Sequence, residues 1–101
     1  SKVINHMEKH YREDLRFEDL AEASHLAPTT LRRLFHESFG CSPMAYFQQL
    51  RVKKAMLMLA DPTKSVGDVA FAVGFNDSGY FTRIFKKETG ETPREFRARI
   101  E

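Results

Sequence analysis

Residues 66–93 constrain the fold of this chain more than any other stretch of its sequence. Apolar residues recur at helical spacing over residues 66–73, and Gly74 follows them directly. Glycine reaches the left-handed backbone conformation that ends many helices, so Gly74 predicts a helix stop. Asp77 is a favourable N-cap for a further helix. The apolar stripe of that helix consists of Phe81, Ile84 and Phe85. The stretch therefore predicts two short helices joined by a tight turn.

The side of the second helix opposite this stripe is polar and basic. It carries Gly79, Arg83 and Lys86, flanked by Thr82 and Lys87. A short helix, a glycine turn and a helix with a basic, hydroxyl-bearing outer face are the parts with which a helix-turn-helix motif addresses the major groove of DNA. We therefore expect such a motif here.

The same pattern occurs earlier in the chain, displaced by about 50 residues. One set of matching pairs is Leu31 with Phe81, Arg33 with Arg83, Leu34 with Ile84, Phe35 with Phe85, Gly40 with Gly90 and Pro43 with Pro93. The helix before it matches at an offset of 49 residues, with the pairs Phe17 and Val66, Asp19 and Asp68, Leu20 and Val69, and Ala21 and Ala70. Two copies are too few for a solenoid. A pair of equivalent DNA-reading units fits better.

The turn of the first copy lacks a glycine. Its first helix is expected over residues 17–24, and His25 then takes the position that Gly74 holds in the second copy. Histidine is a poorer occupant of the left-handed conformation. Arg16 stands where a Ser or Thr cap would be expected, so we expect the start of that helix to fray.

The second helix of this copy is expected over residues 28–39, with Pro28 in its first turn and Gly40 at its end. Its predicted inner face consists of Leu31, Leu34, Phe35 and Phe39. Its outer face consists of Thr29, Arg33 and His36, flanked by Thr30, Arg32 and Glu37. Alone, this pattern fits a solvated amphipathic helix. The shared repeat position of Arg33 and Arg83 favours a reading helix instead.

A long helix is expected between the two copies, over residues 43–60. Ser42 caps it, and Asp61 followed by Pro62 ends it. Its length of about 27 Å, added to the width of each motif, can separate two reading helices by the roughly 34 Å of one DNA turn. Apolar residues on more than one face suit packing by a motif on each side. Its cations, Arg51, Lys53 and Lys54, fit phosphate contact and solvated surface equally well.

Three further helix signals complete the chain. Residues 3–11 form an expected first helix whose buried side consists of Val3, Ile4, Met7 and Tyr11. Ser65 with Asp68, and Thr92 with Glu95, have the spacing of capping boxes. The second box opens an expected last helix over residues 93–100. Phe71 lies off the inner stripe of its own helix, and we expect it to meet the long helix.

Composition excludes several classes of protein. At 101 residues the chain is one domain, and no apolar run approaches the roughly 20 residues of a membrane-spanning helix. The chain opens without a charged and then apolar leader, so we expect no secretory signal. The single Cys41 forms no internal disulfide and fits a reducing compartment. These features predict a cytoplasmic protein without membrane association.

The net charge of +2 is weak evidence for nucleic-acid binding, but the charges are unevenly distributed. Acidic residues gather in the first two expected helices, and basic residues gather in the outer faces and the long helix. No phosphate loop, Cys/His metal set or nucleophilic triad is present, and His6 with His10 lacks a third ligand. We therefore expect no enzyme, no cofactor and no metal site. The alternative is a protein–protein interaction module, but its outer faces would carry large apolar residues.

The second motif resembles the C-terminal signature of AraC/XylS-type transcriptional regulators. The resemblance rests on residues 70–75, residues 80–86, Gly90, Thr92 with Pro93, and Phe96 with Arg97, and it extends over roughly residues 3–100. It implies an all-α unit of about seven helices with two helix-turn-helix motifs. The expected arrangement is a first subdomain over residues 1–42, a linker helix over residues 43–60 and a second subdomain over residues 61–101.

The resemblance also implies which residues contact DNA. Thr29, Arg32 and Arg33 match the positions that enter the first groove, with Thr30 beside them. Ser78, Gly79, Thr82 and Arg83 match those of the second groove, and Gly79 departs from a readout position that has a side chain. Each arginine suits guanine O6 and N7, and Thr29 suits a thymine methyl group. Lys86 and Lys87 are expected to contact phosphates.

We therefore predict a sequence-specific double-stranded DNA-binding domain of a bacterial transcription regulator. The isolated domain is expected to be monomeric, with RNA polymerase as a second partner. The resemblance implies the C-terminal part of a longer, ligand-responsive regulator. A free-standing regulator with two motifs is the alternative.

Overall fold

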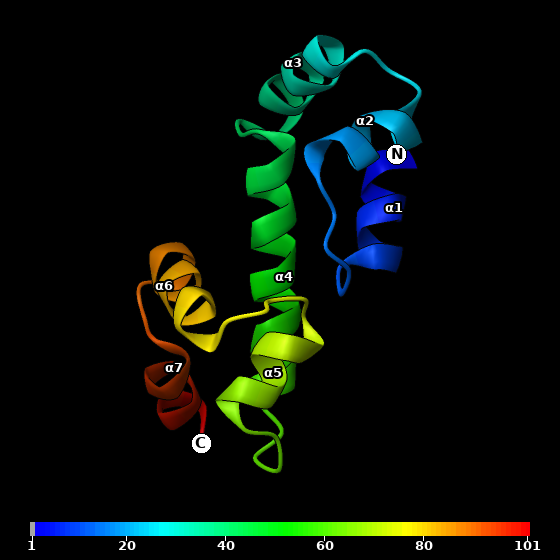
Figure 1. Ribbon diagram of the computed structural model, residues 1–101. Coiled ribbons are helices and arrows are strands. Elements are labelled where there is room, and N and C mark those ends of the chain that lie inside the picture. The colour runs from blue at the N-terminus through cyan, green and yellow to red at the C-terminus, as the bar shows by residue number, and fades with distance from the viewer. Residues whose placement is uncertain (1) are drawn as a thin grey trace. The chain divides into compact units, whose positions relative to one another are not determined.

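The computed structural model describes residues 2–101, and that part of the chain folds into seven α-helices without a β-strand (Figure 1). The helices are α1 (Lys2–His10), α2 (Phe17–Ser24), α3 (Pro28–Phe39), α4 (Pro43–Leu59), α5 (Val66–Ala72), α6 (Ser78–Thr89) and α7 (Pro93–Ile100). The predicted all-α class is confirmed. Among these helices, none is long and apolar enough to cross a membrane.

The chain forms two compact units, and the boundary between them lies within α4. The first unit ends at Leu50, and the second begins at Arg51. Each unit therefore contains one predicted motif and a part of the long helix. In the part of α4 that belongs to the first unit, Phe47 is a member of the core, and Met44, Tyr46 and Leu50 pack against that core.

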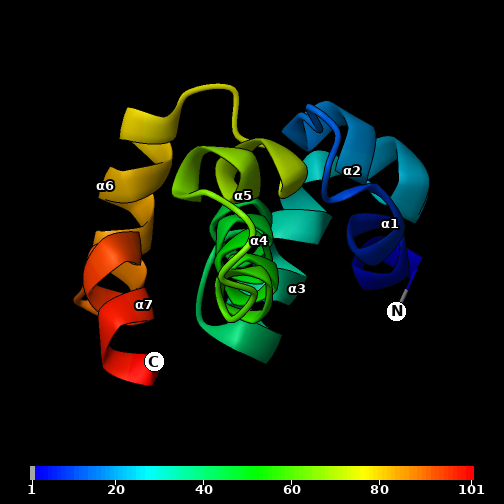
Figure 2. The same cartoon turned by 90° about the horizontal axis from the view of Figure 1, so that it is seen from below.

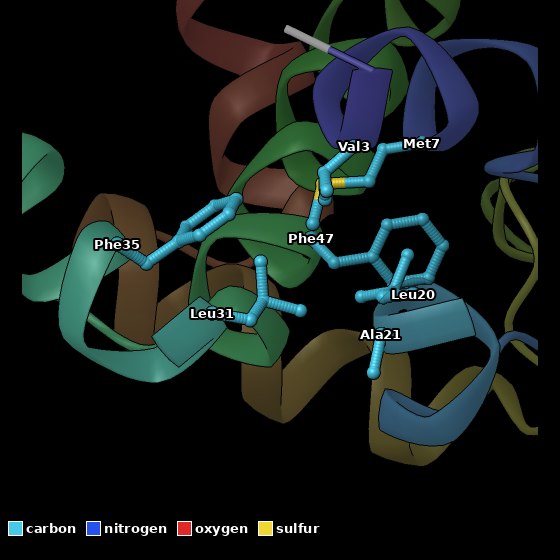
Figure 3. Close-up of a cluster of buried hydrophobic side chains, with 7 residues drawn as sticks. All are labelled: Val3, Met7, Leu20, Ala21, Leu31, Phe35 and Phe47. Atoms are coloured by element: carbon cyan, nitrogen blue, oxygen red, sulfur yellow. The ribbon is translucent and has the colours of Figure 1, made fainter. Parts of the chain in front are cut away.

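In the first unit, helices α1, α2 and α3 share one core with the start of α4. Figure 3 shows the Phe47 ring of α4 lying next to Leu20 of α2, with Val3 and Met7 of α1 above them. The buried core consists of Val3, Met7, Leu20, Ala21, Leu31, Phe35 and Phe47. Burying one large apolar side chain stabilises a fold by about 1.5–3 kcal/mol. This packing fixes the inner faces of α2 and α3.

In the second unit, an aromatic row runs from Phe75, in the turn after α5, to α7. Ring centroids are 5.2 Å apart for Phe75 and Phe81, and 5.7 Å apart both for Phe81 and Phe85 and for Phe85 and Phe96. All four side chains are buried. The row ties α6 to α7, which Figure 2 shows side by side.

Arg97 fastens α7 to the end of α4. Its Nε donates to the carbonyl oxygen of Leu59 at 3.0 Å, and its Nη2 donates to that of Asp61 at 3.3 Å. The last carbonyls of a helix have no partner within that helix. Arg97 therefore donates hydrogen bonds to carbonyl groups at the end of the long helix, and its role is structural.

Two residues of the predicted inner face of α3 are not buried. Leu31 and Phe35 are buried as expected, whereas Leu34 is 38% exposed and Phe39 is 45% exposed. A cavity of about 500 Å³ opens between α1 and α3, and both side chains line it. The apolar stripe of α3 is wider than the surface that its neighbours cover, so the prediction for Leu34 and Phe39 was wrong.

The predicted contact of Phe71 with the long helix is also wrong. Its side chain is 62% exposed, because Val69 and Ala70 occupy the buried side of the short helix α5. Leu57 of α4 is 74% exposed, so packing does not cover every apolar side of the long helix.

The predicted helix caps are present. The Ser65 hydroxyl accepts from the Asp68 N–H at 3.0 Å, and the Thr92 hydroxyl accepts from the Glu95 N–H at 3.1 Å. In return, the Glu95 carboxylate accepts from the Thr92 N–H at 2.8 Å. Hydrogen bonds to this exposed carboxylate from the Thr92 backbone and side chain lower its pKa. The helix starts of α5 and α7 are thus fixed locally.

At the start of α2, the structure supplies a partner that the sequence analysis missed. Arg16 provides no side-chain cap, but its own N–H donates to the Asp19 carboxylate at 2.8 Å. The reciprocal half of a capping box is therefore formed. Asp19 holds the first turn where fraying was expected.

The turn of the second motif is a Schellman motif. Gly74 has a φ of 99°, and its N–H donates to the Phe71 carbonyl at 3.0 Å. The Phe75 N–H donates to the Ala70 carbonyl at 2.9 Å. The left-handed conformation predicted for Gly74 is confirmed.

The first turn reaches the same geometry by a different route. His25 has a φ of 59°, and its N–H donates to the Glu22 carbonyl at 3.2 Å. The Ser24 hydroxyl accepts from the Leu26 N–H at 3.0 Å and donates to the Ala21 carbonyl at 2.7 Å. It therefore bridges the two groups whose counterparts bond directly in the second turn.

We expect unequal effects of substitution in the two turns. Gly74→Val should destabilise the fold by at least about 1–2 kcal/mol, because a β-branched residue is strained at positive φ. His25→Gly should have a much smaller effect or stabilise the fold, since glycine adopts this conformation readily. Thermal melts of both variants test the order, and the reverse order would contradict the equivalence of the turns.

Candidate nucleic-acid interface

The outward face of α6 lies opposite the side chains that bury the helix. Phe81, Ile84 and Phe85 point into the core, and Thr82 is half-buried. The exposed predicted site residues of this helix are Ser78, Gly79, Arg83, Lys86 and Lys87. Packing of the inner stripe therefore presents the predicted set to solvent.

Asp77 fixes the start of α6. Its Oδ1 accepts from the Gly79 N–H at 2.7 Å and from the Tyr80 N–H at 3.1 Å. A Cβ at residue 79 would lie 3.1 Å from this oxygen. Because Gly79 has no side chain, the capping carboxylate of Asp77 can approach its backbone closely.

The polar side chains of α6 have few internal contacts. The Arg83 guanidinium lies over the Tyr80 ring, 5.7 Å from its centroid, and no acidic side chain among residues 2–101 pairs with it. Thr82 donates its hydroxyl hydrogen to the Ser78 carbonyl at 2.9 Å. Towards a ligand, Thr82 therefore offers a methyl group and an accepting oxygen, whereas Arg83 offers its donors.

The outward face of α3 presents two arginines that have internal partners. Thr29, Arg32 and Arg33 are exposed, and Thr30 is half-buried. The Arg32 guanidinium lies 4.2 Å from the ring centroid of Phe17 on α2. Arg33 donates from Nη1 to Oε1 of Glu37 at 3.2 Å. Stacking and ion pairing thus restrict both guanidinium groups before any ligand binds.

Helices α3 and α6 differ in charge at matching positions. His36 corresponds to Lys86, and Glu37 corresponds to Lys87. The sequence analysis placed Glu37 on the flank of α3 but missed its pairing with Arg33. The spacing of four residues on a helix was the signal that could have found this pair. The stacking of Arg32 on Phe17 joins two helices, and spacing along one helix does not reveal it.

Two basic residues of α7, Arg97 and Arg99, make hydrogen bonds within the chain. Arg99 makes a two-pronged contact with Glu91, with distances of 2.9 Å from Nε to Oε1 and from Nη2 to Oε2. These bonds and the charge of Glu91 raise the pKa of Arg99. Arg97 binds the carbonyl oxygens at the end of α4. Two of the three arginines of α7, Arg97 and Arg99, are therefore engaged within the chain, and Arg94 is exposed.

The histidine pair of α1 does not gather a metal-binding set. The rings of His6 and His10 lie 4.4 Å apart, and His10 Nδ1 pairs with the Glu13 carboxylate. Over residues 2–101, no group of three His, Cys, Asp or Glu side chains is arranged around a common point.

Each unit thus contains a short helix, a turn with one left-handed residue, and a second helix with an exposed polar face. This geometry defines a helix-turn-helix protein with two motifs. Residues 20–99 match the family described as a helix-turn-helix domain. The chain belongs to the AraC/XylS-type transcriptional regulators, a DNA-binding family.

Relatives of known name agree with this assignment. The chain is 37% identical to the bifunctional transcriptional activator/DNA repair enzyme AdaA of Bacillus subtilis, over 94% of this chain and 45% of that protein. It is 35% identical to the HTH-type transcriptional activator RhaS of Enterobacter sp., over 96% of this chain and 35% of that protein. The chain thus spans less than half the length of these relatives.

Solved structures share the fold. A transcriptional regulator with an AraC-type DNA-binding domain from Chromobacterium violaceum is 30% identical with a TM-score of 0.90, over 97% of this chain and 88% of that one. The DNA-binding domain of AdpA, determined in complex with a target DNA, is 27% identical with a TM-score of 0.88, over 96% of this chain and 87% of that one.

Removing the N-cap of α6 and adding one to α3 should have opposite effects on stability. Asp77→Ala should destabilise the protein by about 1 kcal/mol, because it removes a side-chain cap. The matching residue before α3 is Ala27, which makes no side-chain cap bond. Ala27→Asp should therefore stabilise the fold. Urea unfolding measures both effects, with Asp77→Asn as a control that retains a capping oxygen. Equal effects of Asp77→Ala and Asp77→Asn would contradict this role.

Proposed function

We propose that this chain binds double-stranded DNA sequence-specifically, with α3 and α6 each entering a major groove, and thereby regulates bacterial transcription. One observation carries the proposal. Both helices expose an arginine at the same repeat position, on a polar face held outward by a buried apolar stripe. A major groove accepts a helix presented in this way.

Each side chain then has a chemical role. Arg33 and Arg83 each bond guanine O6 and N7 together, since a guanidinium presents paired donors. Thr29 contacts a thymine methyl group. Lys86 and Lys87 neutralise phosphates and position the second motif without reading sequence. The surrounding contacts come from Thr30, Arg32, Ser78, Gly79 and Thr82.

A protein–protein interaction module is the rival function. Of the exposed large apolar side chains, Leu34 and Phe39 belong to the predicted inner stripe of α3, Phe71 lies on α5, and Tyr80 of α6 lies under the Arg83 guanidinium. A surface made of Thr, Ser, Gly, Arg and Lys favours DNA as the partner of those two helices. We further propose RNA polymerase as a protein partner, a cytoplasmic location, and service as the DNA-binding part of a longer, ligand-responsive regulator.

The proposal predicts how the isolated domain binds. It should bind as a monomer to an asymmetric site of about 20 base pairs, because one chain already contains two reading helices. Selection of bound duplexes from random DNA, followed by footprinting and by measurement of the mass of the complex, tests this. A site confined to one half-turn, or a palindrome that requires two chains, would contradict it.

Lys87→Ala should weaken binding to all duplexes alike. Loss of one phosphate contact should reduce the slope of log affinity against log salt by about 0.9. Titrations at several salt concentrations measure this slope, with Lys9→Ala on α1 as a control for removal of a surface charge. A changed base preference at an unchanged slope would show that Lys87 does not contact phosphate.

Loss of specificity should be larger at the first motif than at the second. The first offers Thr29, Arg32 and Arg33, whereas the second combines Arg83 with short side chains and a glycine. A two-pronged base contact is worth about 1–3 kcal/mol of discrimination. Site selection with Arg33→Ala and with Arg83→Ala should therefore show the greater loss of information for Arg33→Ala. Equal or reversed losses would refute this asymmetry.

A further inference from the structure

Glu37 is an acidic residue on the outward face of α3. Its Oε1 lies 3.2 Å from Nη1 of Arg33, and each of the two side chains is 59% exposed. The matching residue of the second motif is Lys87. A carboxylate therefore stands on the first reading helix where the second has a cation.

Stability does not account for this ion pair. Exposed pairs contribute little to folding, because water screens them and two long side chains must be ordered. The order is also the weaker one, with the basic residue on the N-terminal side of the acidic one. The pair is easily broken, so its effect is expected where Arg33 meets another partner.

DNA offers Arg33 two kinds of partner. Phosphates occur along every duplex, whereas paired acceptors at O6 and N7 occur only on guanine. Glu37 competes for Arg33 with both, and it also repels nearby phosphates. The two-pronged base contact outweighs an exposed ion pair, whereas a single screened phosphate contact does not.

We propose that Glu37 is a specificity-determining residue of the first motif, which rests on the proposed function above. The Glu37 carboxylate holds Arg33 away from phosphates and repels the DNA backbone. Helix α3 therefore binds a duplex only where Arg33 can exchange its ion pair with Glu37 for a contact with guanine. Glu37 thus weakens binding to incorrect duplexes rather than strengthening binding to the correct one.

The test compares Glu37→Gln and Glu37→Lys with the wild-type domain. Affinity is measured for the selected duplex and for an unrelated duplex of equal length, over a range of salt concentrations. Asp14→Asn and Asp14→Lys are matched controls, because Asp14 is exposed in the connection between α1 and α2.

Glu37→Gln should tighten binding to the unrelated duplex by about twofold to fivefold, the effect of one exposed ion pair. It should tighten the selected duplex less, so the ratio of the two affinities falls. Glu37→Lys should lower this ratio further and steepen the salt slope by about 0.9. The Asp14 variants should leave the ratio unchanged. In an Arg33→Ala background, Glu37→Gln should lower the ratio less than it does alone.

If the wild type prefers its selected duplex, three outcomes would overturn the inference about Glu37 and leave the proposed function intact. An unchanged ratio in Glu37→Gln would show that Glu37 does not discriminate. Weaker binding of the selected duplex alone would show that Glu37 contacts a base, such as the cytosine amino group, or orients Arg33 towards one. Equal falls in ratio for the Asp14 variants would show a general effect of charge. A wild type without preference for any duplex would overturn the proposed function as well.

Discussion

Burial of the apolar stripes of α3 and α6 is the interaction on which the candidate site depends. A helix of 12 residues is marginal in water, so α3 and α6 need tertiary packing to exist. Leu31 and Phe35 anchor α3, and Phe81 and Phe85 anchor α6. Because these side chains fix how each helix is rotated about its axis, they also decide which residues face outward. On the proposed function, readout of DNA thus depends on buried residues that do not contact the DNA.

Local rules allowed much of the fold to be predicted from the sequence. The caps of α5, α6 and α7 and the left-handed turns at His25 and Gly74 depend on residues a few positions apart, and all are present in the structure. Leu34 and Phe71 were assigned to buried positions and are exposed. An apolar period shows which side of a helix is apolar, but the coverage of that side depends on neighbours from elsewhere in the chain.

The candidate site shows the same division between local and tertiary information. The residues with outward positions on α3 and α6 could be selected from helical spacing, and their contacts with DNA stay a prediction. The pairing of Arg33 with Glu37 is local and was available from their spacing. The stacking of Arg32 on Phe17 depends on how α2 packs against α3, which spacing within one helix does not contain.

The two motifs show how a repeat can keep its geometry while its chemistry diverges. One turn uses a glycine and a direct backbone bond, and the other uses His25 and a bridging Ser24 hydroxyl. The outward faces of α3 and α6 have diverged further, because Lys86 and Lys87 match His36 and Glu37. On the proposed function, the second motif attracts any duplex, whereas the first resists an incorrect one. Because α4 joins them covalently, binding by the lysine-rich motif raises the effective concentration of DNA at the other. The first motif can then discriminate among sites even if it binds DNA weakly by itself, because the second motif already holds the DNA close to it.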